Sequence, residues 1–362
     1  MPTVTDVLVD LVPGKVINNR WKIEGKLGEG CCGAVFKVHD INHTNVKAAL
    51  KVEPNEESIN VLKKEASVLK QLQVRQHTMR LVYSGRRELY SYVVMSLLGR
   101  SLNDIRREIE GVYMTAGTVS RIGVHGLYAI KQLHEIGYVH RDIKPANMVT
   151  GRLGYQRRII YLIDYGMARN YAVWEDGKPR IRRSRDNVLL RGTVRFCAPT
   201  VHDRREQGRR DDIWSFLYML VELHVGLPWP GKPEDKVEQM KRETTDAELL
   251  ADCPKEWMEV MTHIHTLAYE TRPNYRMIYN CFMATMARLN VTFDDPYDWE
   301  TPADLEKLPP KMSMKSALNS TKKNAEKDRS DLGTIMSKVG GESAYVYPTT
   351  VAAEFDKDDI RL

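Results

Sequence analysis

Four polar side chains with a regular spacing point to phosphoryl-transfer chemistry. Asp142, Lys144 and Asn147 lie in the run H-R-D-I-K-P-A-N at 140–147, and Asp164 opens the triplet D-Y-G. Phosphoryl transfer needs a carboxylate that orients a hydroxyl, a cation that stabilises the moving group, and oxygen ligands for metal ions. We therefore interpret Asp142, Lys144 and Asn147 as catalytic, and Asn147 and Asp164 as Mg²⁺ ligands. An isolated H-R-D would usually be an ordinary turn, but eight ordered positions followed by D-Y-G are far more specific.

A glycine-rich loop predicts contacts to nucleotide phosphates. Residues 28–35 read G-E-G-C-C-G-A-V between two strand-like segments. A dinucleotide-binding turn would open a helix instead, so the flanking strands favour a loop that covers phosphates. Glycine lets backbone amides approach a phosphate without a Cβ in the way. The residues expected to contact ATP here are Leu27, Gly28, Gly30, Gly33 and Val35.

Lys51 is the predicted ligand of the α- and β-phosphates of ATP. A lysine at the end of a strand is usually only a surface residue, but after this loop it can reach the phosphates if a carboxylate holds it. Glu53, Glu56 and Glu57 are nearer in the sequence. Glu65 lies in the middle of the next predicted helix, where an inward face is available, so it is the predicted partner.

The hydrophobic pattern changes character at about residue 99. Before it, strand-like runs accompany a single amphipathic helix at 59–72. The strand-like runs are 21–24, 34–38, 46–52, 80–83 and 89–95. After it, apolar residues recur at helical spacing, and 211–224 is apolar on nearly every face, which predicts a buried helix. We expect an α+β fold.

Composition excludes several classes of protein. The chain is 42% apolar and 28% charged, as globular proteins are, and its 362 residues suggest two lobes. It has no apolar run near the ~18 residues of a spanning helix, so we expect no membrane partner. The first residues lack a basic leader, and five cysteines form no C-x-x-C pair. These features predict reduced thiols and a cytoplasmic protein, with the nucleus as a second compartment.

Seven basic residues and one acidic residue, Asp186, lie between 178 and 195. The basic residues are Lys178, Arg180, Arg182, Arg183, Arg185, Arg191 and Arg195. Most charge runs are solvated loops; the functional readings are an acidic or phosphorylated substrate, or nucleic acid. Because no aromatic residues are interleaved at a base-stacking spacing, we expect no nucleic-acid partner.

Five further motifs identify a family. They are V-M-S-L-L-G-R-S-L at 94–102, R-G-T-V-R-F at 191–196, R-D-D-I-W-S at 210–215, P-W at 228–229 and D-P-Y-D-W at 295–299. With the segments above, they make residues 21–299 resemble a eukaryotic protein kinase. Within that superfamily the chain looks like the casein kinase I group, and most like its tau-tubulin kinase branch.

The resemblance implies the bilobal protein-kinase fold. We expect an N-lobe at 21–96, built from an antiparallel β-sheet and one helix, and a mainly helical C-lobe at 97–300. Residues 1–20 would be an N-terminal extension. Residues 301–362 would be a largely disordered tail, because the composition after Pro309 shifts to Lys, Ser, Thr, Asp and Gly. A docking tail regulated by phosphorylation is the alternative reading.

The resemblance also implies roles for particular residues. ATP would lie in the cleft between the lobes, beside Ala49, with Met95 as gatekeeper and Leu97 and Leu98 in the hinge. Asp212 would brace the catalytic loop from the buried helix. ATP and Mg²⁺ are the implied cofactors.

The implied partners are proteins with Ser or Thr acceptor sites, since Lys144 follows the serine/threonine pattern. The group favours acidic or already phosphorylated sites, and Arg195 matches the arginine that it uses to bind the anion. Lys232 is the predicted second cation, and Lys236 is an alternative. We expect a monomer.

Two other classes of function compete with a protein kinase. A pseudokinase-like scaffold would use the basic segment to bind an acidic partner, but it is favoured by loss of Lys51, Asp142, Asn147 or Asp164, and all four are present. A phosphotransferase that acts on small molecules is disfavoured by the extended segment 167–199, which a peptide substrate needs as a platform. The pair Cys31 and Cys32 is either oxidisable or inert.

Overall fold

The structure is a computed structural model that describes residues 11–30, 33–55, 61–109, 113–308 and 351–362. The chain divides into two compact units. The first holds the residues up to Gly99 together with Gly151–Arg157, and the second holds Arg100–Thr150, Arg158–Leu308 and the C-terminal segment. Among the described residues, no helix has both the length and the apolar character needed to cross a membrane.

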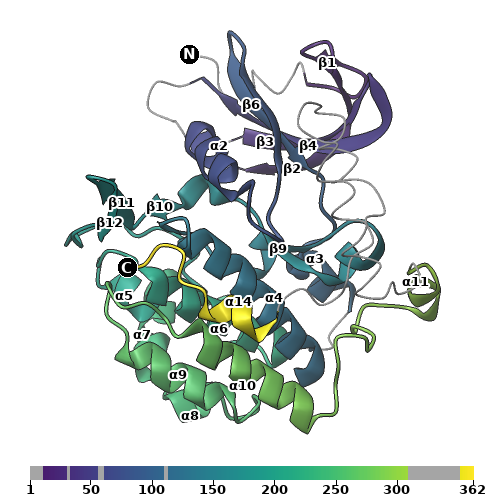
Figure 1. Cartoon of the computed structure of the whole chain (residues 1–362). Coiled ribbons are helices and arrows are strands. Elements are labelled where there is room, and N and C mark those ends of the chain that lie inside the picture. The colour runs from purple at the N-terminus through teal and green to yellow at the C-terminus, as the bar shows by residue number, and fades with distance from the viewer. Residues whose placement is uncertain (1–10, 31–32, 56–60, 110–112, 309–350) are drawn as a thin grey trace. The chain divides into compact units, whose positions relative to one another are not determined.

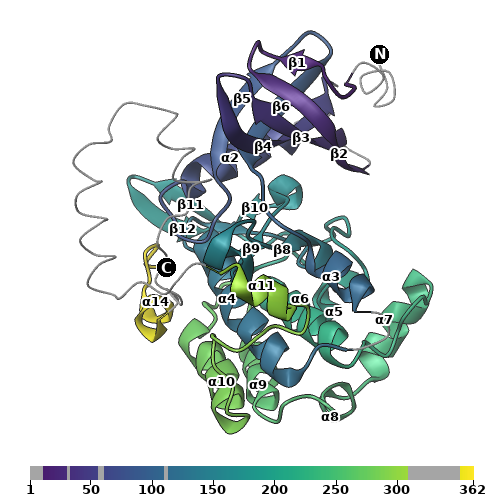
Figure 2. The same ribbon diagram turned by 90° about the vertical axis from the view of Figure 1, so that its right-hand side faces the viewer.

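In its described residues, the first unit is an antiparallel sheet with one α-helix (Figures 1 and 2). Its strand order is β1-β2-β3-β4-β6-β5. The strands are β1 (Val16–Ile17), β2 (Trp21–Gly30), β3 (Gly33–Asp40), β4 (His43–Pro54), β5 (Leu81–Arg86) and β6 (Tyr90–Ser96). The helix α2 (Val61–Leu72) packs on β5 and β6. The sheet and its single helix agree with the predicted N-lobe.

Alternation along the strands gives this sheet two distinct faces. In β3 every second residue is buried, because side chains of a strand point to opposite faces in turn. Phe36, Val38 and Leu50 share one core with Trp21. Ile17 and Leu11 belong to the same core, and β1 pairs with β2. Over its described part, the predicted extension at 1–20 is therefore built into the sheet.

The second unit is mainly helical. Its helices are α3 (Leu102–Glu108), α4 (Ala116–His134), α5 (Pro199–His202), α6 (Arg209–His224), α7 (Glu234–Glu243), α8 (Asp246–Leu249), α9 (Trp257–Thr266), α10 (Tyr275–Arg288), α11 (Pro302–Glu306) and α14 (Ala352–Asp356). Helix α4 packs against α6 and α10, and the Phe216 and Phe282 rings meet edge to face. Most of α6 is buried, as its apolar pattern predicts.

Short strands join these helices and shape the loops between them. They are β7 (Tyr138–Val139), β8 (Met148–Thr150), β9 (Ile160–Leu162), β10 (Arg169–Asn170), β11 (Ala172–Glu175) and β12 (Lys178–Ile181). The antiparallel pairs are β7 with β10, β8 with β9 and β11 with β12. Three 3₁₀ turns accompany them, η1 (Pro145–Asn147), η2 (Gly154–Arg158) and η3 (Tyr165–Met167). An α+β, two-lobed fold is thus confirmed.

The two ends of the predicted tail have a defined structure. Thr301 caps α11 through its hydroxyl, and residues 351–362 form α14 and an extended terminus. Phe355 and Ile360 are buried on the second unit, at 2% and 4% exposure. In residues 351–362, two apolar side chains therefore pack against the second unit. The largely disordered tail stays a prediction, and residues 309–350 lie outside the described residues.

A buried arginine fixes the segment that carries the D-P-Y-D-W motif. Arg158 Nη2 lies 2.6 Å from the Glu300 carboxylate, and both side chains are almost fully buried. The guanidinium also donates to the backbone carbonyls of Asp294 and Asp295, and the Tyr297 hydroxyl donates back to the Arg158 carbonyl. One cation therefore satisfies several buried acceptors.

We expect Arg158→Met to lower the free energy of unfolding by about 3–5 kcal/mol, because it leaves the buried Glu300 charge and the carbonyls without a donor. The matched control is Arg180→Met, whose ion pair with Glu175 is exposed and should contribute at most about 1 kcal/mol. Urea unfolding followed by tryptophan fluorescence measures both. Equal losses in the two variants would contradict this account of the segment.

Candidate active site

Asp142 is held by four contacts in the second unit. Its Oδ1 accepts hydrogen bonds from the backbone N–H and the hydroxyl of Thr193, at 2.9 and 2.7 Å. Its Oδ2 lies 3.1 Å from Asn147 Nδ2 and 2.8 Å from Lys144 Nζ. The carboxylate is 7% exposed. The structure thus brings the three predicted catalytic side chains together and fixes the orientation of the carboxylate.

Asp212, on the buried helix α6, holds the backbone of the catalytic loop. Its two oxygens accept from the amides of His140 and Arg141, at 2.6 and 2.8 Å. Arg141 has φ of +69°, a conformation that L-residues rarely adopt and that needs such external support. The structure therefore shows the brace expected of Asp212.

The charge of Asp212 is stabilised in a fully buried place. Burial acts to raise the pKa of the Asp212 carboxyl, but the hydrogen bond from His134, 2.9 Å away, and the amide of His140 outweigh it and hold that pKa below its usual range. Burial lowers the pKa of His134. The His134 ring also meets the Tyr275 hydroxyl at 2.7 Å, so the brace is itself fixed from α4 and α10.

His140 and Arg141 contact the segment that begins at Asp164. His140 Nε2 meets the Ile163 carbonyl at 3.0 Å, and its ring packs edge to face with Tyr165. Arg141 Nε donates to the Met167 carbonyl at 2.8 Å. Both residues therefore hold the catalytic loop against the segment that begins at Asp164.

A short hairpin brings the two predicted metal ligands to one end of a strand pair. Strands β8 and β9 pair Met148 with Leu162, and the Ile163 amide donates to the Asn147 carbonyl at 3.0 Å. Asn147 directly precedes β8, and Asp164 lies two residues beyond β9. The chain therefore places these two residues next to each other across the open end of the hairpin.

The donor atoms at this hairpin suit a hard divalent cation. Asn147 Nδ2 donates to the Asp142 carbonyl at 2.8 Å, so the amide oxygen is the atom turned to a cation. Asp164 adds a carboxylate, and its φ of +64° marks a constrained turn. Mg²⁺ binds through one or two protein oxygens and completes its shell with phosphate and water. The amide oxygen of Asn147 and the carboxylate of Asp164 fit this mode of binding.

Thr193 and the glycine before it were not predicted as site residues. Besides its bonds to Asp142, the Thr193 hydroxyl accepts from Lys144 Nζ at 3.0 Å. Gly192 has φ of +103°, and a Cβ there would lie 2.3 Å from the Arg141 carbonyl oxygen. Only glycine permits this approach. The R-G-T-V-R-F motif contained both residues, but the sequence did not show which loop they would contact.

In the first unit, Lys51 pairs with the carboxylate that the sequence favours. Lys51 Nζ lies 2.7 Å from Glu65 Oε2, with Glu65 1% exposed and Lys51 18% exposed. Glu53 instead accepts from the amides that start α2, with the Leu62 amide at 2.6 Å. Glu56 and Glu57 lie outside the described residues. The position of Glu65 inside the helix was thus the decisive signal.

The other residues predicted for ATP gather on one face of the same sheet. Val35 pairs with Lys51 across β3 and β4, and Ala49 pairs with Met95 across β4 and β6. Because Ala49 and Lys51 are two positions apart, all four side chains lie on the face opposite Phe36 and Leu50. Leu97 and Leu98 follow β6 and are half-buried.

The glycine-rich loop is a tight hairpin between β2 and β3. Gly30 pairs with Gly33, and Gly28 pairs with Val35. A Cβ at Gly33 would lie 1.9 Å from the Val52 carbonyl oxygen, whereas Gly28 and Gly30 face open space. Leu27 is exposed. Cys31 and Cys32 at the tip lie outside the described residues, so their predicted redox behaviour stays open.

No hydrogen bond or ion pair links Arg195 with Lys232 or Lys236, the residues predicted to bind a substrate anion, within the described part of the chain. Arg195 Nη2 donates to Glu222 Oε1 at 2.6 Å, and the Glu222 side chain is 18% exposed. Lys232 is exposed and makes no hydrogen bond with Arg195 within the described part of the chain. Lys236 donates to Gln239. One guanidinium nitrogen of Arg195 is therefore already paired with a carboxylate.

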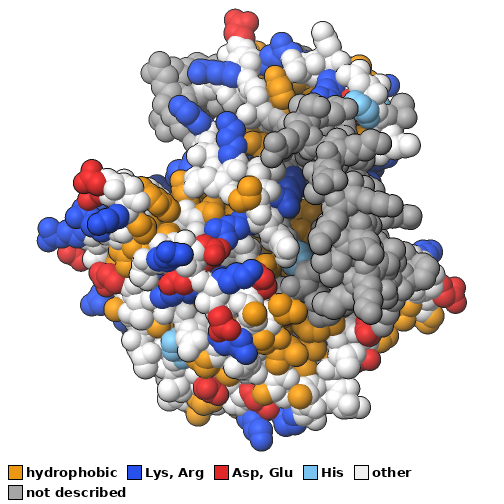
Figure 3. Space-filling model, viewed as in Figure 1, with side chains coloured by type: hydrophobic (Ala, Val, Ile, Leu, Met, Phe, Trp, Pro, Cys, Tyr) orange, Lys and Arg blue, Asp and Glu red, His pale blue; other side chains and the backbone are white. Residues whose placement is uncertain are grey.

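Some of the basic segment is paired with nearby carboxylates. Arg180 pairs with Glu175 in the exposed β11–β12 hairpin, and Arg185 pairs with the buried carboxylate of Glu206. Figure 3 shows the basic side chains interspersed with acidic ones around this hairpin. The charge surplus that the sequence suggests is thus reduced on the folded surface.

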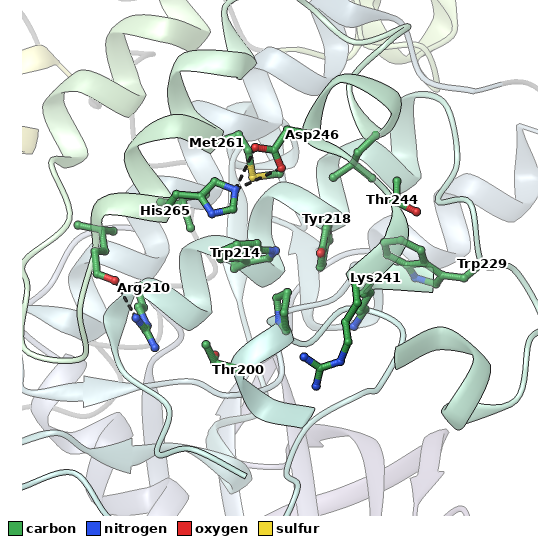
Figure 4. Close-up of a pocket in the computed structure, with 15 residues that line it drawn as sticks. Thr200, Arg210, Trp214, Tyr218, Trp229, Lys241, Thr244, Asp246, Met261 and His265 are labelled. Atoms are coloured by element: carbon green, nitrogen blue, oxygen red, sulfur yellow. Dashed lines mark hydrogen bonds and ion pairs between the residues drawn. The ribbon is translucent and has the colours of Figure 1, made fainter. Parts of the chain in front are cut away.

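Lys241 holds the residues that follow Thr193, and no motif in the sequence pointed to it. Its Nζ donates to the Val194 and Cys197 carbonyls, at 2.6 and 2.7 Å. Figure 4 shows Lys241 beside Trp229 in a pocket that also contains Tyr218. Burial lowers the pKa of Lys241 to about 8. A single buried side chain therefore ties α7 to the residues that follow Thr193.

Comparison with known proteins gives a consistent family. The family model described as protein kinase domain matches residues 21–283. A candidate serine/threonine-protein kinase of Caenorhabditis elegans is 40% identical over 79% of this chain and 84% of its own length. An inactive tau-tubulin kinase of the same organism is 34% identical over 68% of this chain and 89% of its own.

A third relative comes from a fungus. Casein kinase I homolog 3 of Schizosaccharomyces pombe is 33% identical over 78% of this chain and 66% of its own length. The domain match, the two-lobed fold and these relatives agree with the motifs at 94–102 and 191–196. The chain belongs to the protein kinase family, in which it is a tau-tubulin kinase-like member of the casein kinase I group.

Proposed function

We propose that this chain is an active serine/threonine protein kinase that transfers the γ-phosphate of ATP to Ser or Thr side chains of proteins. The observation that carries the proposal is the arrangement around Asp142. Its carboxylate is oriented by Thr193 and Asn147 and lies 2.8 Å from the Lys144 ammonium. A protein that only binds partners has no need of this arrangement.

Each polar side chain has a step in the proposed reaction. Asp142 orients the acceptor hydroxyl and takes its proton as the new bond to phosphorus forms. Lys144 stabilises the negative charge on the transferred group. Lys51, oriented by Glu65, binds the α- and β-phosphates. Asn147 and Asp164 would hold Mg²⁺, which when bound neutralises phosphate charge.

A scaffold without catalytic activity is the second candidate, because one relative is named an inactive tau-tubulin kinase. In this chain the side chains that phosphate transfer requires are present, and four of them form two ion pairs. Lys51 pairs with Glu65, and Asp142 pairs with Lys144. These pairs support the active enzyme over the scaffold.

We further propose that acidic or phosphorylated acceptor sites are preferred, with Arg195 as the anion ligand. A guanidinium binds phosphate oxygens bidentately. Arg195 Nη2 lies 2.6 Å from Glu222 Oε1. Glu222 Oε2 accepts a hydrogen bond from the Leu227 amide at 3.0 Å. A substrate phosphate would displace one carboxylate oxygen, while the second keeps Glu222 in place.

We expect Lys51→Met and Asp164→Asn each to reduce phosphate transfer from ATP at least ~100-fold, because phosphate binding and metal binding are lost separately. Lys47→Met is the matched control, since Lys47 lies on the same strand and pairs with the partly exposed Glu24. A radiolabel transfer assay with melting curves for each variant measures the effect. Near-normal transfer by either variant would favour the scaffold.

We expect Thr193→Val to lower kcat by a factor of about 10–150, because a hydrogen bond to a charged group contributes about 1.5–3 kcal/mol. Thr193→Ser retains the hydroxyl and should keep most of the activity. Steady-state kinetics with one peptide measures both variants. If serine and valine gave the same rate, the hydroxyl would have no part in positioning Asp142 and Lys144.

We expect Arg195→Ala to reduce kcat/KM for acidic or phosphorylated peptides about tenfold or more relative to neutral peptides, because a charge-assisted contact is lost. Glu222→Gln should shift the preference in the opposite direction, since glutamine keeps the size of the side chain and releases Arg195. A peptide array with and without priming phosphates measures the ratio. Equal losses on neutral peptides would remove Arg195 from the proposed site.

A further inference from the structure

The C-terminal segment, defined here as residues 351–362, is docked on the second unit. Phe355 on α14 is 2% exposed. Its ring stacks on Tyr279 with centroids 4.6 Å apart and meets Tyr128 edge to face at 5.8 Å. Tyr128 belongs to α4 and Tyr279 to α10, and Figures 1 and 2 show α14 beside these helices. An aromatic socket thus receives one side chain of the segment.

Ion pairs and backbone hydrogen bonds fix the direction of the segment beyond Phe355. Asp356 lies 2.5 Å from Arg276, and the Lys357 carbonyl accepts from Arg272 at 2.6 Å. The Asp359 amide donates to Glu135 Oε2 at 2.6 Å. Glu135 is buried, and its Oε1 lies 2.7 Å from Arg272. These contacts follow the chain residue by residue, so the docking has a defined register.

The segment ends against the two elements that carry the catalytic residues. Ile360 is 4% exposed and packs with Val139, Tyr171 and Ala172. Val139 directly precedes His140, and β7 pairs with β10, so Val139 lies opposite Arg169. Tyr171 follows β10 in the segment that begins at Asp164. Ile360 therefore covers the β7–β10 pair, which connects the catalytic loop to the D-Y-G segment and is called the joint below.

Hydrogen bonds connect the joint to Asp212 through Tyr171 and His134. The Tyr171 hydroxyl donates to the His134 carbonyl at 2.8 Å, and the His134 ring bonds to Asp212. A shift of Tyr171 would therefore displace His134, whose ring orients the Asp212 carboxylate. This chain of contacts gives Ile360 a physical route to the loop that holds Asp142.

We propose that the C-terminal segment of this chain is a positioning element for the reaction, in which Phe355 anchors the segment and Ile360 fixes the joint between β7 and the D-Y-G segment. Ile360 is a positioning residue, since it touches none of the groups assigned to chemistry. Only the kinetic part of this inference rests on the proposed function. The occupant of the socket is the chain's own terminus, which carries both the apolar side chains and the acidic Asp356 that match it.

Hydrogen exchange on the full chain tests the docking without any activity. In Phe355→Ala and Ile360→Ala, amide exchange in peptides that cover 137–143 and 168–173 should be about tenfold faster, because a local cover of the joint is lost. Val351→Ala is the matched control, since Val351 is in the same segment but 48% exposed. Unchanged exchange in both test variants would overturn the docking.

A synthetic peptide of residues 351–362 identifies the occupant. Added to the full-length Phe355→Ala chain, it should restore slow exchange at 137–143, whereas the same peptide with Phe355→Ala should not. Failure of the intact peptide to restore protection would overturn the proposal. If protection of the unaltered chain fell on dilution, the socket would be filled by a second copy, and the assignment to the chain's own terminus would be wrong.

Kinetics test the positioning role. Ile360→Ala should lower kcat about three- to tenfold with an unchanged KM for ATP, because small displacements of catalytic groups reduce the rate of transfer. Ile360→Leu should retain both the rate and the exchange protection. If exchange rose in Ile360→Ala while kcat stayed constant, the docking would stand and the positioning role would be refuted. A chain with no transfer activity in its unaltered form would instead contradict the proposed function.

Discussion

The rest of the candidate active site depends on the hydrogen bonds that the buried carboxylate of Asp212 makes. It accepts the amides of His140 and Arg141 and bonds to the His134 ring. A charge in this position costs free energy unless all its lone pairs are satisfied, and removing one partner of such a buried set typically costs about 3–5 kcal/mol. The left-handed backbone of Arg141 exists only within this arrangement. The orientation of Asp142, one residue later, follows from it.

From Asp212 and the catalytic loop, hydrogen bonds and close packing extend to the segment 191–197. Asp142 bonds to Thr193, and Gly192 fits against the Arg141 carbonyl. Lys241 holds the carbonyls on the other side of Thr193. The segment is thus fixed by hydrogen bonds on both sides of Thr193.

Local patterns predicted much of this site, and contacts between distant residues were the part that they missed. The choice of Glu65 over Glu53 followed from helix position, and Val35 was predicted from the glycine-loop motif, whereas Ala49 came from the family resemblance. Thr193, Lys241 and the pairing of Arg195 with Glu222 depend on which loops meet in space. Spacing along the chain contains no signal for such meetings. The anchoring of Phe355 was missed for the same reason, because its partners Tyr128 and Tyr279 lie far from it in the sequence.

The electrostatics of the basic segment show how folding alters a conclusion drawn from net charge. Seven cations against one acid suggest an open anion-binding surface. In the structure, Glu175, Glu206 and Glu222 pair with three of those arginines. Exposed pairs such as the one at Glu175 contribute little free energy and exchange readily, whereas the buried carboxylate of Glu206 keeps its arginine. The readiness of each arginine to bind an added anion therefore depends on the strength of its own pair, and the carboxylate of the Arg195–Glu222 pair is intermediate in exposure between those of the other two.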